Sequence, residues 1–207
     1  MKPPILWAAT AACFILLAAA RPGWAGGPTD QIRETTDKIL DVVKDPALKG
    51  PAKAAERRER IRALVNERFD WSEIARRALG RYWRGKTEDE KKEFTSLFAR
   101  LVEETYMNRV EDYSGELIRY TGEHVDGDYA SVDVVIVTKN NVDIPVEYKL
   151  MLEGTRWLVY DVFIEGVSLV NNYRTQFDGI LTNESFAQLL KMLKAKVTED
   201  KPPPAPG

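Results

Sequence analysis

Apolar side chains recur every three or four positions from residue 29 to residue 113, which is the spacing of amphipathic helices. The pattern predicts helices over residues 29–44, 52–68, 70–80 and 88–112. In two places a polar capping residue is followed three positions later by an acid, a combination that marks a helix start. These pairs are Asp70 with Glu73 and Thr87 with Glu90.

The hydrophobic period falls to two between residues 116 and 165, where β-branched and aromatic residues dominate. The pattern predicts strands over 116–121, 128–138, 142–152 and 156–164, and the tight turns between them predict an antiparallel meander. One face of the second and third strands is apolar, so other elements must cover it. Pro145 has no backbone donor, so we expect the third strand to be bulged there or to lie at an edge.

Helical spacing returns at Ser168 and continues in two stripes, the second of which is expected to begin at an Asn183 cap. The order of elements predicts an α+β fold. We expect an antiparallel sheet of about four strands, with N- and C-terminal helices packed on one face.

The first 25 residues have the three parts of a secretory signal. Lys2 supplies a positive start, an apolar run extends from Ile5 to Ala20, and Gly23 and Ala25 are spaced as in a cleavage site. This run of 16 residues is shorter than the roughly 20 that span a bilayer, which favours a cleaved signal over a retained anchor. The predicted organisation is a signal peptide over 1–25, one domain over 26–197 and a disordered proline-rich tail over 198–207.

Composition excludes several classes of protein. The 207 residues include 30 basic and 32 acidic side chains, a net charge of -2, so no basic footprint indicates nucleic-acid binding. One Cys and one His exclude a Cys/His zinc site and a disulfide framework. We therefore expect no metal and no cofactor, and a domain held together by packing alone.

Two residues are candidates for catalysis. His124, in a predicted turn between Gly122 and Gly127, is either a general base or an exposed loop residue, and no partner for it can be placed. Asp161 lies in an apolar strand, where it is either a base or an ion-paired structural carboxylate, and the structural interpretation is favoured. The chain has no phosphate loop, G-x-S-x-G or H-E-x-x-H motif, so an enzyme has little support.

A basic cluster surrounds Gly80, and it either contacts anionic head groups or an acidic partner, or is a solvated helix end. Its members are Arg76, Arg77, Arg81, Arg84 and Lys86.

Several separated motifs resemble the MlaC family of periplasmic phospholipid-binding proteins, also called the toluene-tolerance family. They are Leu79-Gly80-Arg81-Tyr82-Trp83, Thr105-Tyr106, Trp157 with Tyr160-Asp161-Val162, and the run from Glu165 to Val170 followed by Tyr173-Arg174 and Phe177. The resemblance covers about residues 28–195. It implies a monomeric carrier, exported to the periplasm, that shuttles glycerophospholipid between an outer-membrane lipoprotein complex and an inner-membrane ABC transporter complex. Such a carrier maintains outer-membrane lipid asymmetry and is not an enzyme.

A carrier of this kind must keep about 30 methylenes from water, a cost of roughly 20 kcal/mol or more if they were exposed. We therefore expect an apolar lipid pocket between the sheet and the helices, with a polar rim. Arg76, Arg81 and Arg84 are the candidates for contact with the head group or with a partner. The side chains expected to line the pocket, chosen from the faces of the predicted elements, are Phe94, Phe98, Leu101, Tyr106, Val132, Val134, Val146, Tyr148, Leu150, Val162, Val170 and Tyr173.

Two alternatives stay open, because periodicity does not separate a filled core from one that opens around a ligand. The chain could be a small-molecule enzyme or binding domain of a cone-like α+β fold that uses Asp161. It could also be an adaptor with a full core, whose surface does the work.

Overall fold

The computed structural model describes residues 26–199, so the predicted signal peptide and nearly all of the predicted tail lie outside the described residues. The helices fall close to the predicted ranges. They are α1 (Pro28–Lys44), α2 (Ala54–Arg68), α3 (Trp71–Leu79), α4 (Glu88–Glu111), α5 (Leu169–Asn183) and α6 (Phe186–Glu199), with short 3-10 turns η1 (Pro46–Leu48), η2 (Pro51–Lys53) and η3 (Gly80–Gly85).

Local chemistry sets the helix ends. The Thr87 side chain accepts a hydrogen bond from the Glu90 amide, and the Glu90 carboxylate accepts one from the Thr87 amide, which confirms the predicted capping box. The expected Asn183 cap is wrong, because Asn183 is the last residue of α5. Ser185 starts α6 instead, and its hydroxyl accepts a hydrogen bond from the Gln188 amide.

The strands form one antiparallel sheet in the order β1-β2-β3-β4-β5, as the tight turns predict. Their bounds are β1 (Leu117–Asp126), β2 (Tyr129–Val137), β3 (Asp143–Glu153), β4 (Arg156–Ile164) and β5 (Val167–Ser168). The two-residue β5 was not expected, and β1 continues five residues beyond its predicted end at residue 121. His124 is therefore an exposed strand residue opposite Ser131 and not a turn residue.

Pro145 lies in a central strand without the predicted bulge. It pairs with Val135 in continuous register, and the irregularity in β3 lies between Lys149 and Leu150. The Pro145 carbonyl accepts a hydrogen bond from the Glu165 amide, just beyond the end of β4. The backbone N–H and C=O of a strand residue point to the same side. The N–H that Pro145 lacks would therefore face the place where β4 has ended, so no hydrogen bond of the sheet is lost.

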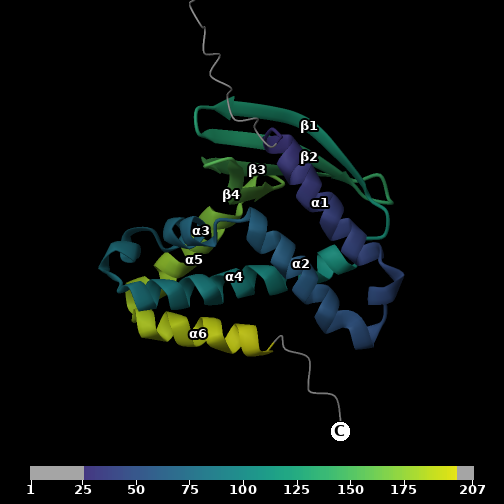
Figure 1. Cartoon of the computed structure of the whole chain (residues 1–207). Coiled ribbons are helices and arrows are strands. Elements are labelled where there is room, and N and C mark those ends of the chain that lie inside the picture. Colours follow the sequence, from purple (N-terminus) through teal and green to yellow (C-terminus); the bar gives the residue numbers. More distant parts are fainter. Residues whose placement is uncertain (1–25, 200–207) are drawn as a thin grey trace, which may run out of the picture.

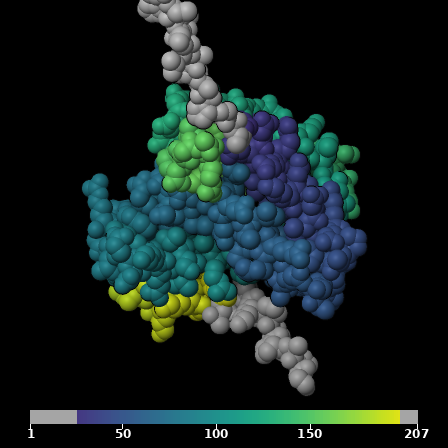
Figure 2. Space-filling model, viewed as in Figure 1, coloured from purple at the N-terminus to yellow at the C-terminus, as the bar shows by residue number. Residues whose placement is uncertain are grey.

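The helices lie on one side of the sheet (Figure 1). Helix α1 crosses the sheet and contacts β1, β2 and β4, while α3 and α5 contact β4. Helices α4 and α6 pack against each other farther from the sheet (Figure 1). In the space-filling view, α1 and α2 form a continuous surface on the viewed side, between the sheet above and α6 below (Figure 2).

Helix α2 is attached to α4 mainly by ion pairs, because Ile61 is its one buried residue. The Arg62 Nε atom lies 2.8 Å from a carboxylate oxygen of Glu103, whose side chain is 4% exposed. Burial raises the pKa of the Glu103 carboxyl, against the opposing effect of Arg62. The other pairs of this helix contact are Arg57 with Glu111, Arg58 with Glu104 and Glu111, and Arg62 with Glu104.

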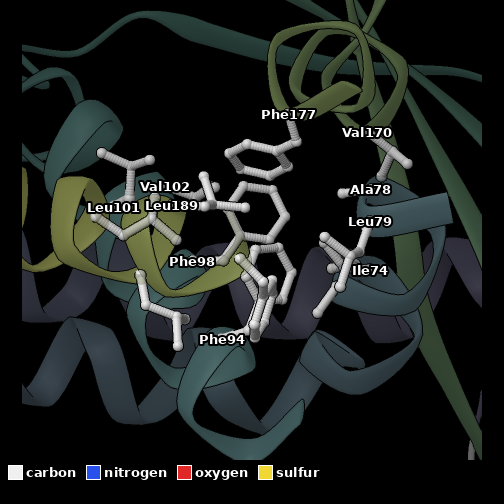
Figure 3. Close-up of a cluster of buried hydrophobic side chains, with 14 of the residues drawn as sticks. Ile74, Ala78, Leu79, Phe94, Phe98, Leu101, Val102, Val170, Phe177 and Leu189 are labelled. Atoms are coloured by element: carbon white, nitrogen blue, oxygen red, sulfur yellow. The ribbon is translucent and has the colours of Figure 1, made fainter. Parts of the chain in front are cut away.

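Buried apolar residues form two clusters and not one. The helical cluster contains residues of α3, α4, α5 and α6. Its centre is a column of phenylalanine rings, in which Phe98 lies 5.7 Å from Phe94 and 5.2 Å from Phe177 between ring centroids. Figure 3 shows these rings between Ile74, Ala78 and Leu79 on one side and Leu101, Val102 and Leu189 on the other.

The sheet cluster is built on the apolar face of the sheet. Its buried members are Ile32, Ala130, Val132, Val134, Val146, Leu150, Trp157, Val159 and Val162. Phe69, just after α2, is the one half-buried side chain that packs against both clusters among the described residues. A domain of this size usually has one contiguous core. The division of the core between the helical layer and the sheet is therefore the feature of this protein that its function must explain.

Candidate functional site

The apolar face of the sheet is closely covered at one end. The side-chain oxygen of Gln31 accepts hydrogen bonds from the Trp157 amide at 3.0 Å and from Arg68 at 2.6 Å, and Arg68 also donates to the Trp157 carbonyl. The Asp70 amide donates to the Val159 carbonyl at 2.9 Å. These bonds tie the start of α1 and the end of α2 to β4, and the apolar residues beneath them are fully buried.

The other end of the same face is less covered. The residues there pack against the sheet cluster but are only half-buried: Ile118, Tyr120, Ile136, Ile144, Tyr148 and Ile164. On the helical side, half-buried residues at the margin of the helical cluster include Tyr106, Leu169 and Tyr173. We call these two sets of half-buried side chains the inter-cluster rim. Apolar surface that is free at the boundary of two cores is suited to an apolar ligand.

The twelve residues predicted to line a pocket are divided between the two clusters. Val132, Val134, Val146, Leu150 and Val162 are buried in the sheet cluster, and Phe94, Phe98, Leu101 and Val170 are buried in the helical cluster. Phe94 and Phe98 are 0% exposed, so their rings leave no surface for a ligand in this conformation. Tyr106, Tyr148 and Tyr173 belong to the rim. The helical pattern predicted burial of these phenylalanines but did not indicate whether protein or ligand buries them.

Sequence reasoning missed the isoleucines of the rim, Ile118, Ile136, Ile144 and Ile164. Ile118 and Ile144 have the correct alternation with other apolar residues on their strands, so this signal was available. Ile164 lies two positions after Val162, which was among the predicted lining residues, so the same alternation indicated it as well.

The three arginines predicted to contact a head group or a partner lie on the outside of α3 and η3. Arg76 forms two hydrogen bonds of 2.6 Å with Glu73, and Arg81 lies 2.8 Å from Asp178 of α5. Arg76, Arg81 and Arg84 are all exposed. The nearby Arg77 instead lies over the ring of Tyr160, 4.1 Å from its centroid.

Asp161 has a structural role at the start of α5. One carboxylate oxygen accepts hydrogen bonds from the Val162 and Val170 amides at 2.8 and 3.0 Å, and the other accepts one from the Ser168 hydroxyl at 2.6 Å. The carboxylate therefore satisfies a free amide at the first turn of a helix, where a negative charge is favourable. These contacts explain Asp161 without a catalytic function.

Two open grooves lie on the surface of the described residues, and the second includes the rim residues Ile118 and Tyr120. One, of about 660 Å³, is bordered by Trp71, Trp83 and charged residues of α2 and α4. The other, of about 650 Å³, runs between α1 and the edge strand β1, with Arg33, Leu40, and Tyr120 among its lining residues. Neither groove is bordered by any of the twelve predicted lining residues.

From residue 26 to residue 199, no three His, Cys, Asp or Glu side chains are grouped so that they could hold a metal ion. None of the helices in that part of the chain combines the length and apolarity needed to cross a membrane.

One antiparallel sheet with the helices of residues 26–199 on its apolar face, and a core divided between those layers, defines an α+β fold. The chain belongs to the MlaC family, because the model of the MlaC protein family matches residues 33–195.

Two curated relatives are similar in sequence. The intermembrane phospholipid transport system binding protein MlaC of Haemophilus influenzae is 24% identical over 128 residues, which are 59% of this chain and 60% of that protein. The toluene tolerance protein ttg2D of Pseudomonas putida is 25% identical over 168 residues, 80% of this chain and 76% of that protein. The match to the Haemophilus protein thus spans less than two thirds of its length.

A solved structure has the same fold. The phospholipid-binding protein of Ralstonia solanacearum, solved in complex with a phospholipid, superposes with a TM-score of 0.73 at 21% identity. The match covers 84% of this chain and 99% of that one, and it confirms the α+β architecture that the sequence predicted.

Proposed function

We propose that this protein is a periplasmic carrier that binds a glycerophospholipid by its acyl chains and moves it between outer- and inner-membrane complexes. Membership of the MlaC family and the names of the two relatives support lipid transport. The observation that carries the proposal in this chain is the divided core, with half-buried apolar side chains at the margins of both parts.

The acyl chains would lie at the inter-cluster rim. About 30 methylenes at roughly 0.8 kcal/mol each give the chains a strong preference for an apolar environment over water. The sheet side of the rim contributes isoleucines, and the helical side contributes Leu169, Tyr106 and Tyr173. The fully packed phenylalanine column then acts as the rigid support of the helical wall and not as lipid-contacting surface.

The proposed partners are an inner-membrane ABC transporter complex and an outer-membrane lipoprotein complex. We assign Arg76, Arg81 and Arg84 to partner contact and not to the head group, because they are exposed on the outside of α3 and η3. A row of exposed cations there would direct encounter with an acidic partner surface, and its effect would weaken with added salt. The carrier is proposed to act as a monomer after removal of residues 1–25.

Native mass spectrometry of the protein purified from bacterial cells tests the proposal. The expected result is a population one phospholipid heavier than the chain from residue 26, which loses that mass on organic extraction. A protein that never carries phospholipid, even after incubation with vesicles, would contradict it.

A bulky substitution at the sheet face distinguishes lipid that is bound at the rim from lipid that adheres non-specifically to the protein surface. Ile144 is half-buried in the rim, so Ile144→Trp should occupy space that the chains need and reduce lipid loading. Val142 is 56% exposed, and Val142→Trp is the matched control that should load normally. Circular dichroism and thermal unfolding establish that both variants are folded before loading is compared.

A further inference from the structure

One polar side chain stands in the middle of the apolar sheet face. Tyr148 lies on β3 between Val146 and Leu150, the neighbours that share its face. Its direct partners on the adjacent strands are Val132 on β2 and Val162 on β4. Val132 is 0% exposed and Val162 is 9% exposed, so the phenol ring is embedded in an apolar surface.

The environment of Tyr148 is both enclosed and accessible. Its side chain is only half-buried. Burial nevertheless raises the pKa of its hydroxyl to about 12, with a further contribution from the neighbouring Tyr120 phenol. Tyr148 is one of the rim side chains, so its accessible surface lies where the acyl chains are proposed to lie.

No hydrogen bond to the Tyr148 hydroxyl is present among residues 26–199. A hydroxyl in an apolar environment is destabilising while it has no partner. Residues 26–199 thus leave the Tyr148 donor for another molecule.

We propose that the Tyr148 hydroxyl donates a hydrogen bond to an ester carbonyl oxygen of the bound lipid, and that the carrier therefore prefers diacyl-ester lipids to lipids with ether-linked chains. This inference rests on the proposed lipid-carrier function and names the chemical class of its cargo. Ester carbonyls are neutral acceptors at the point where the acyl chains join the glycerol. A phosphate would bring a charge into an apolar surface, which is costly without a cation to pair with it.

Competition between two matched lipids tests the proposal. Delipidated protein is incubated with vesicles containing equal amounts of a diacyl-ester and a dialkyl-ether phosphatidylethanolamine with the same chain length, and loading is counted by native mass spectrometry. One hydrogen bond corresponds to about a 2- to 10-fold preference for the ester. Equal loading of the two lipids by the unmodified protein would overturn the proposal without any substitution.

Two variants identify the donor. Tyr148→Phe removes only the hydroxyl and should bring the ester-to-ether ratio to about one, while loading of the ether lipid is unchanged. Tyr113→Phe, which removes a hydroxyl that donates to the Glu116 carbonyl at 2.9 Å and lies outside the rim, is the control and should keep the preference of the unmodified protein. A preference that survives Tyr148→Phe would assign the contact elsewhere and overturn the proposal. Failure of both lipids to load would instead refute the carrier function itself.

Discussion

Two residues on the same face of β3 test whether the core is divided as the structure indicates. Leu150 is 0% exposed in the covered part of the sheet cluster, whereas Ile144 is half-buried in the rim. Leu150→Ala removes packed atoms and leaves a cavity, so we expect a loss of about 2–5 kcal/mol in the free energy of unfolding. Ile144→Ala removes three carbons worth about 0.8 kcal/mol each when buried, so half burial predicts a loss of about 1 kcal/mol.

The effect on lipid binding should have the opposite order. Ile144 would contact the acyl chains, so Ile144→Ala should weaken lipid retention by about 5-fold, which corresponds to about 1 kcal/mol. Leu150 would not contact them, and Leu150→Ala should bind lipid normally while it is folded.

The stability measurement is urea unfolding of delipidated protein, followed by tryptophan fluorescence, with Trp157 as a buried reporter of the sheet cluster. Lipid retention is measured by native mass spectrometry on the same samples. A loss above 2 kcal/mol for Ile144→Ala in lipid-free protein would indicate a filled core there. So would lipid retention that is the same in both variants, and either result would refute the divided core as the binding site.

Phe98→Ala should lower the free energy of unfolding, measured in urea, by about 3–5 kcal/mol, because the ring is fully buried against other aromatic rings. A loss below about 1 kcal/mol would contradict the structural role of Phe98. Asp161→Asn should cost about 1 kcal/mol in thermal or urea unfolding without changing lipid loading, since it weakens the cap of α5; loss of function with full stability would restore a chemical role for Asp161. The Glu103 carboxyl has a raised pKa in the folded state, so the folded protein binds more protons and its stability should rise as pH falls toward the raised value. We therefore compare the free energy of unfolding of the unmodified protein with that of Glu103→Gln at pH 7 and at pH 5. The difference should favour the unmodified protein more at pH 5 than at pH 7. A difference that is the same at both pH values would show that the pKa of Glu103 is not raised.

The sequence predicted most elements because local signals specify them. The capping box at Thr87, the tight turns of the meander and the alternation on β2 are properties of neighbouring residues, and the structure places these elements within a few residues of their predicted bounds. One exception was the end of β1. Its extension depends on pairing with β2 beyond Tyr120, which the β1 residues alone do not indicate.

The candidate site was less predictable, because periodicity identifies which face of an element is apolar but not what covers it. Phe98 and Tyr148 both lie on apolar faces, yet one is packed by three rings and the other keeps accessible surface. The role of Asp161 depends on Ser168 and Val170, seven and nine residues along the chain, which meet it only after β4 and β5 pair.

The sequence by itself determined the α+β class, the order of helices and strands, and the motifs that placed the chain in its family, since these depend on residues close together in the chain. The tertiary structure alone decided that the buried residues divide into a helical and a sheet cluster, and that Tyr148, at the margin of the sheet cluster, has no hydrogen-bond partner among residues 26–199. Burial and hydrogen bonding between layers depend on how separate elements pack, and hydrophobic period does not contain that information.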